Sequence, residues 1–150
     1  MTKRAGKRRV VASVAIGVMS AVLGGCGLTS AIHGAPPGGL VSAINAQRAA
    51  RGLPLVGSNT GLDDFAGNWA GHLAATGVLE HQDLATVPGW NALGETLEMG
   101  ACGQPDAAIV TAWMNSPSHN AIVASPAYRL VGVAKVCADG NEYVVADFGG

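Results

Sequence analysis

Basic residues are scarce in this chain of 150 residues once its first nine positions are set aside. Four follow (Arg48, Arg51, Arg129 and Lys135), whereas all ten acidic residues lie after Cys26. The part of the chain after Cys26 therefore carries a formal net charge of −6 with neutral histidines. Such a protein lacks the positive surface that neutralises phosphates, so we expect no nucleic acid partner and no electrostatic attraction to anionic lipid headgroups.

The sequence also lacks a long hydrophobic run. The uncharged apolar run Val10–Leu23 is too short to span a membrane comfortably. It follows five basic residues and ends in Leu-Gly-Gly-Cys at Cys26, an order typical of an export signal, whose last four residues resemble a bacterial lipobox. We therefore expect residues 1–25 to be a lipoprotein signal peptide and lipidated Cys26 to anchor the protein on the extracytoplasmic face of the cell membrane. The alternative is an ordinary signal peptide cleaved after Ala31, which would give a secreted protein.

Cysteine is rare, with three in the chain, of which Cys26 belongs to the lipobox. Cys102 and Cys137 remain as an even pair in an exported domain, and this predicts a disulfide bond between them. A closed loop of about 35 residues stabilises a protein by roughly 3–4 kcal/mol in the chain-entropy interpretation. The alternative is a pair of buried thiols.

The organisation after Cys26 is simple. Residues 26–39 include Pro36-Pro37-Gly38-Gly39 and show no apolar periodicity, so we expect a flexible tether. Residues 40–150 are about the size of one compact domain.

Apolar spacing predicts three helices in this domain, one from Leu40 to Ala49, a second over residues 62–73 and a third from Pro105 through Trp113. Two strands, 131–136 and 143–148, flank Asp139-Gly140-Asn141, which is typical of a hairpin. Helices followed by an antiparallel hairpin indicate an α+β domain, although the segment 91–100 is ambiguous.

Three polar residues, His81, Glu95 and His119, each lie at the end of a predicted element, where a rigid scaffold can hold a functional group. In a domain with few charges, burying such groups is costly unless they pair with one another. If folding brings them together, they form a polar pocket that can move protons or hold a divalent ion. The alternative is three isolated surface or capping residues, because spacings of 14 and 24 residues match no local metal motif.

The order of several short segments resembles the CAP superfamily, which contains cysteine-rich secretory proteins, antigen 5 proteins and pathogenesis-related proteins, in its short bacterial form. The segments that carry this resemblance, none of them specific alone, are Asn45-Ala46-Gln47-Arg48, Arg51-Gly52-Leu53-Pro54-Leu55, Trp69-Ala70 with His81, Gly94-Glu95-Thr96, the run from Trp113 to His119, Tyr128 with Val131-Gly132-Val133, and Asp147-Phe148-Gly149.

The resemblance implies a three-layer α-β-α sandwich with a central antiparallel sheet and a cleft lined by two histidines and two acids. His81 and His119 match the histidines, and Glu95 matches the acid of the family's Gly-Glu-Asn. Thr96 replaces that asparagine, which keeps a hydrogen-bonding group but loses the amide. Ser116 stands where many eukaryotic members have the second acid, so the implied site keeps three of four residues.

Two imidazoles and one carboxylate form a ligand set that zinc accepts with water in the fourth position, so His81, Glu95 and His119 are also candidate metal ligands. Ser116 and Ser118 near His119 suggest a serine hydrolase instead, although the sequence has no Gly-x-Ser-x-Gly nucleophile elbow.

Three functions follow as hypotheses from these residues. We favour an envelope binding module that takes a small hydrophobic, peptide or metal ligand in the His/Glu-lined cleft. A metal- or serine-dependent hydrolase acting on peptides is the first alternative, and a module that recognises another envelope protein is the second.

Overall fold

The computed structural model describes residues 39–150; the predicted signal peptide, Cys26 and the predicted tether up to Gly38 lie outside this range. Its elements are α1 (Gly39–Ala49), β1 (Gly57–Ser58), α2 (Thr60–Thr76), the 3₁₀ turn η1 (Leu84–Thr86), β2 (Leu93–Ala101), α3 (Asp106–Asn115), α4 (Pro117–Val123), β3 (Leu130–Ala138) and β4 (Asn141–Gly149). Across residues 39–150, no helix has both the length and the apolar character needed to cross a membrane.

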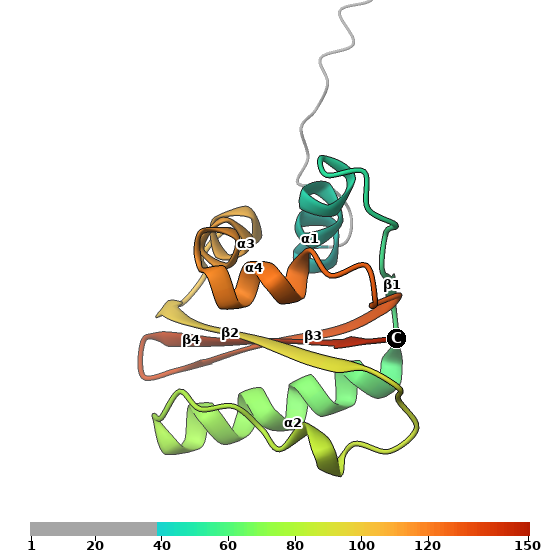
Figure 1. Ribbon diagram of the computed structural model, residues 1–150. Helices are drawn as coiled ribbons and strands as arrows, with labels where there is room; N and C mark the ends of the chain where they lie inside the picture. Colours follow the sequence, from blue (N-terminus) through green and yellow to red (C-terminus); the bar gives the residue numbers. More distant parts are fainter. Residues whose placement is uncertain (1–38) are drawn as a thin grey trace, which may run out of the picture. The chain divides into compact units, whose positions relative to one another are not determined.

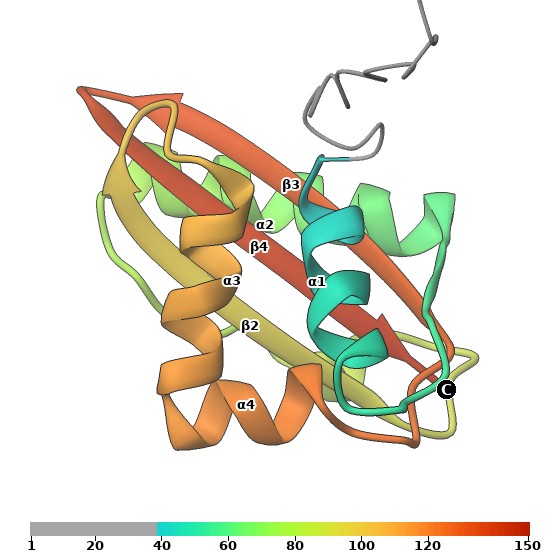
Figure 2. The ribbon, with the colours of Figure 1, turned by 90° about the horizontal axis from the view of Figure 1, so that it is seen from above.

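A four-stranded sheet of order β1-β3-β4-β2 forms the middle layer. The helix α2 covers one face, and α1, α3 and α4 cover the other (Figures 1 and 2). This arrangement confirms the predicted α+β sandwich with three layers. The sheet is mixed rather than wholly antiparallel, because β1 pairs with β3 in parallel over two residues, while β2, β4 and β3 are antiparallel neighbours.

Each face of the sheet has its own hydrophobic core. The core on the side of α1, α3 and α4 contains Leu40, Ile44, Val56, Ile109, Val110, Trp113, Val123, Val131, Val144, Ala146 and Phe148. The core on the side of α2 contains Ala66, Ala70, Leu73, Leu97, Tyr143 and Val145. Successive residues of a strand point to opposite faces, so β4 supplies both cores in alternation and is buried along almost its whole length.

The helix α2 lies close against β3 at Gly132. A Cβ atom on Gly132 would stand 2.0 Å from the carbonyl carbon of Leu62 and 2.2 Å from the amide nitrogen of Asp63. Next to it, the amide of Val133 donates to Asp63 Oδ1 over 2.9 Å. The absence of a side chain at Gly132 therefore lets the first turn of α2 pack directly on the sheet.

The predicted hairpin and the disulfide bond are both confirmed. Asp139 and Gly140 connect β3 to β4 with φ angles of 51° and 82°, the left-handed conformation that a two-residue hairpin turn requires. The side chains of Cys102 and Cys137 are bonded, which ties the segment after β2 to β3.

The ambiguous segment 91–100 contains the edge strand β2. Gly94, Glu95, Thr96 and Leu97 are all buried, because both faces of this part of the sheet are covered by helices or loops. An apolar–polar alternation is therefore absent from the sequence, and the helix and strand patterns could not be told apart there.

Candidate functional site

The loop that carries His81 is positioned by the end of α2. The helix ends at Gly77, whose amide donates to the carbonyl of Leu73 over 2.8 Å. Further along, the indole Nε1 of Trp69 donates to the carbonyl oxygen of Glu80 over 2.8 Å. Trp69 is partly buried, and its ring stacks on that of exposed His72. The residue before His81 is thus fixed to the helix.

His81 forms a short contact with the predicted acid. Its Nδ1 lies 2.6 Å from Oε1 of Glu95 on β2. The side chain of His81 is 61 % exposed and that of Glu95 is 1 % exposed, so a buried carboxylate supports an imidazole that faces solvent. With Glu95 as the acceptor of this bond, the proton lies on Nδ1 of His81, which leaves Nε2 available.

Gln82 holds Glu95 from the other side. Its backbone amide donates to Glu95 Oε1 over 3.2 Å, and its side-chain amide donates to Glu95 Oε2 over 2.7 Å. The same Nε2 lies 2.9 Å from each carboxyl oxygen of Asp147 on β4. Both oxygens of Glu95 are therefore occupied within the protein.

Asp147 is a second buried acid at this site. It is directly opposite Glu95 in the pairing of β2 with β4, and it is 2 % exposed. Burial, together with the negative charge of Glu95, raises the pKa of Asp147 to about 7, although the hydrogen bond from Gln82 opposes part of that rise. Asp147 can therefore carry a proton near neutral pH.

His119 lies on α4, which covers the face of the sheet opposite to α2 (Figure 1). It is half-buried, and burial together with the charge of nearby His81 lowers its pKa. The lowered pKa favours a neutral imidazole at His119, the form that binds metal ions.

The predicted three-residue metal set is not assembled as expected. Within residues 39–150, no three side chains of His, Cys, Asp or Glu converge on a common point suited to a metal ion. The physical reason is that Glu95 directs its oxygens to His81 and Gln82 rather than to a shared position. The two histidines remain as candidate ligands, with Glu95 behind His81.

Comparison with known protein families identifies the family of this chain. The family model described as the cysteine-rich secretory protein family, CAP, matches residues 41–148. The chain belongs to the CAP family.

Solved structures give the same fold. The chain is 24 % identical to an outer surface protein of Borrelia burgdorferi, with a TM-score of 0.64, covering 73 % of this chain and 88 % of that one. It is 19 % identical to an extracellular protein of Bacillus anthracis that contains an SCP domain, with a TM-score of 0.60, covering 73 % of this chain and 38 % of that one. NaASP2, solved with Zn²⁺, is 14 % identical with a TM-score of 0.53 and coverages of 73 % and 76 %. No curated protein matches by sequence.

Ser116 has a structural place in this CAP domain. It ends α3 and caps α4, and its hydroxyl lies 3.2 Å from that of Ser118. Neither hydroxyl hydrogen-bonds to a histidine among the residues that the structure describes. Thr96 also differs from the expectation, because its buried Oγ1 has no hydrogen-bond partner within residues 39–150.

Sequence reasoning missed Gln82 and Asp147 as members of the site. Asp147 could have been found, because it continues the alternation of Tyr143 and Val145 on the α2 side of β4, where a carboxyl group is out of place. Gln82 carries no comparable signal beyond its position next to His81.

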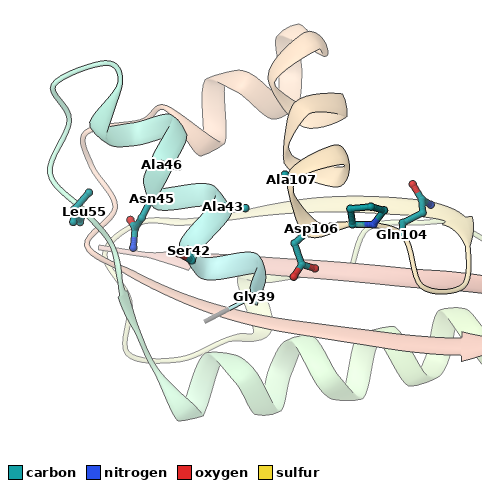
Figure 3. A pocket seen from close by; sticks show the side chains of 10 residues that line it. Gly39, Ser42, Ala43, Asn45, Ala46, Leu55, Gln104, Asp106 and Ala107 are labelled. Atoms are coloured by element: carbon teal, nitrogen blue, oxygen red, sulfur yellow. The ribbon is translucent and has the colours of Figure 1, made fainter. Parts of the chain in front are cut away.

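An apolar pocket of about 780 Å³ lies elsewhere in the CAP domain. It is bordered by α1, by Leu55 and by residues 104–107 at the start of α3 (Figure 3). His81, Glu95 and His119 do not line it. The polar site and this pocket are therefore separate features, whereas we expected one cleft for both kinds of ligand.

Proposed function

We propose that this CAP protein is an exported binding module whose site is the histidine pair His81 and His119, and that the pair takes a divalent cation such as Zn²⁺. The proposal is carried by the 2.6 Å contact between exposed His81 and buried Glu95. Glu95 acts behind His81 rather than as a ligand.

The donor set suits zinc. Imidazole nitrogens are common zinc ligands, and a ligating histidine usually donates its other N–H to a carboxylate, which fixes its tautomer and raises its basicity. Glu95 occupies that position relative to His81, and the depressed pKa of His119 keeps a lone pair free near neutral pH. Two protein ligands leave open positions, at which a bound zinc ion would act as a Lewis acid toward an oxygen atom of a ligand. NaASP2, solved with Zn²⁺, is a relative with this fold.

Zinc titration by calorimetry tests the proposal. We expect the wild type to bind one zinc ion, and His81→Ala and His119→Ala to weaken binding by more than about tenfold, because each removes a ligand. Glu95→Gln should weaken it by about 10–100-fold, the usual effect of losing a hydrogen-bonded partner of a ligand.

His72→Ala is the matched control, because His72 is exposed on α2 and lies 3.4 Å from Glu80 without a buried carboxylate behind it. An unchanged affinity in this control is expected. Absence of binding heat in the wild type, or equal losses in His72→Ala and His119→Ala, would refute the histidine pair.

The serine-dependent alternative loses its main support, since Ser116 and Ser118 pair with each other. A metal-dependent hydrolase would use the same two histidines, and turnover of a peptide library that depends on added zinc would identify it.

The proposed location is the outer face of the cell membrane, with Cys26 lipidated. The support is the basic segment, the short apolar run and the Leu-Gly-Gly-Cys motif of the sequence. Replacing Cys26 by alanine should move the protein from the membrane fraction to the soluble fraction after export, because no acyl chain can then be attached. Retention of the variant in the membrane fraction would contradict the anchor, and Cys102→Ala serves as the control for loss of a cysteine.

A further inference from the structure

Two buried carboxyl groups face each other in this site. Glu95 and Asp147 are directly opposite on the antiparallel strands β2 and β4, and each is 2 % exposed. Side chains directly opposite on neighbouring strands lie about 4.5–5.5 Å apart, and like charges placed there repel. Among residues 39–150, no lysine or arginine forms an ion pair with either acid.

Gln82 connects the two acids. Its side-chain amino group has two hydrogens, which is the number needed to donate to Glu95 Oε2 at 2.7 Å and to the Asp147 carboxyl group at 2.9 Å. Its backbone amide adds a third bond, to Glu95 Oε1. One neutral residue thus fixes the rotamer of Glu95 and holds Asp147 against it.

We propose that Gln82 and Asp147 are positioning residues of the site, which hold Glu95 in the orientation that keeps the His81 proton on Nδ1 and leaves Nε2 free for a ligand. The proposal rests on the proposed function for its binding consequence, but its structural part concerns the metal-free protein.

The chain of contacts supports this role step by step. Asp147 accepts from the Gln82 amide, which fixes the direction of that amide; the amide then fixes Glu95 Oε2, so that Oε1 remains directed at His81 Nδ1. Without Gln82, Glu95 would be free to rotate toward other donors, and both tautomers of His81 would be populated.

Nitrogen-15 NMR of the imidazole rings in the metal-free protein tests the structural part. In the neutral imidazole of wild-type His81, we expect the proton on Nδ1 and none on Nε2. In Gln82→Leu, the chemical shifts of both His81 ring nitrogens should move toward the average of the two tautomers, whereas those of His72 should stay unchanged. Gln47→Leu on α1 is the control for replacing a glutamine, and it should leave His81 unaffected.

Asp147 is tested by a pair of variants, because Gln82→Leu could fail to fold. Asp147→Asn keeps an oxygen acceptor for the Gln82 amide and should preserve the His81 signals. Asp147→Leu removes that acceptor and should move them in the direction of Gln82→Leu. Zinc affinity should change in the same variants as the NMR signals. We expect a loss of about tenfold in Gln82→Leu and in Asp147→Leu, and no such loss in Asp147→Asn.

Different results would refute the zinc-binding function and the positioning role of Gln82 and Asp147. Wild-type signals for His81 in both Gln82→Leu and Asp147→Leu would overturn the positioning role, whatever the zinc affinity. A wild type that binds no zinc but shows the expected change in tautomer would overturn the proposed function and leave the positioning role intact.

Discussion

Replacing Arg48 by methionine should destabilise the protein by about 3–5 kcal/mol, because it removes a buried guanidinium group that donates to four backbone carbonyl groups at once. Arg48 is fully buried. Its Nε donates to the carbonyl of Pro54 over 2.9 Å, its Nη1 donates to those of Val123 and Ser125 over 2.8 and 2.9 Å, and its Nη2 donates to that of Tyr128 over 3.2 Å. One guanidinium group therefore joins α1 to the end of α4 and to the segment before β3.

The fork of five N–H donors explains why arginine is required. Lysine keeps the positive charge but offers three donors at a single point, so Arg48→Lys should still lose about 2 kcal/mol. Burial lowers the pKa of Arg48, and the charge of Arg129 lowers it further. Burying a positive charge costs free energy, and the hydrogen bonds to the four carbonyl groups offset part of that cost.

Urea denaturation measures both effects. The matched control is Arg51→Ala, which removes an exposed guanidinium that bonds only to Gln47, and which should change the free energy of unfolding by less than about 0.5 kcal/mol. A loss of similar size in Arg51→Ala, or a loss below about 1 kcal/mol in Arg48→Met, would contradict this interpretation.

Asp147→Asn should stabilise the protein at about pH 8 and have little effect at about pH 3. The folded-state pKa of Asp147 is about 7, above its ordinary value of 3.8. Below 3.8 the carboxyl group is protonated in both states, so it costs nothing. Between 3.8 and 7 the unfolded chain releases a proton that the folded protein keeps, so stability falls as pH rises, and the full cost is reached above 7.

The full cost is roughly 4 kcal/mol, because the pKa differs by about 3 units between the two states and each unit corresponds to about 1.4 kcal/mol. Asparagine removes the ionisation and keeps the shape and an acceptor for Gln82. Thermal unfolding of the variant and the wild type between about pH 3 and pH 8 measures the difference.

The stability gained in Asp147→Asn should grow with pH across this window and level off above about 7. Asp64→Asn on the exposed face of α2 is the control, and it should show no such growth. A gain that is the same at all pH values would mean that the Asp147 carboxyl group does not titrate in this range.

The fold was predictable where local patterns are strong. The helical stripe of Leu62, Ala66, Ala70 and Leu73 is buried as its spacing indicates, and the hairpin turn at Asp139 and Gly140 follows from turn chemistry. The edge strand β2 was not predictable, because burial on both faces removes the alternation that marks a strand. The parallel strand β1, of two residues, is too short to leave a pattern.

For the site, the resemblance to the CAP family brought His81 and Glu95 together correctly. It included Asp147 in a matching segment but assigned neither Asp147 nor Gln82 a role in the site, because those roles depend on a strand register that pairs residues 52 positions apart. It also suggested a shared metal set, whereas the hydrogen bonds of Glu95 direct that residue away from the position of a ligand.

We propose that a histidine pair with a buried carboxylate behind it forms the binding site. Anomalous diffraction at the zinc edge, from crystals of the protein soaked in zinc, is the decisive measurement. We expect a zinc peak bonded to Nε2 of His81 and to His119, with Glu95 still bonded to Nδ1 of His81. A peak bonded directly to Glu95, or one at His72 and Glu80 with none at His81, would contradict it.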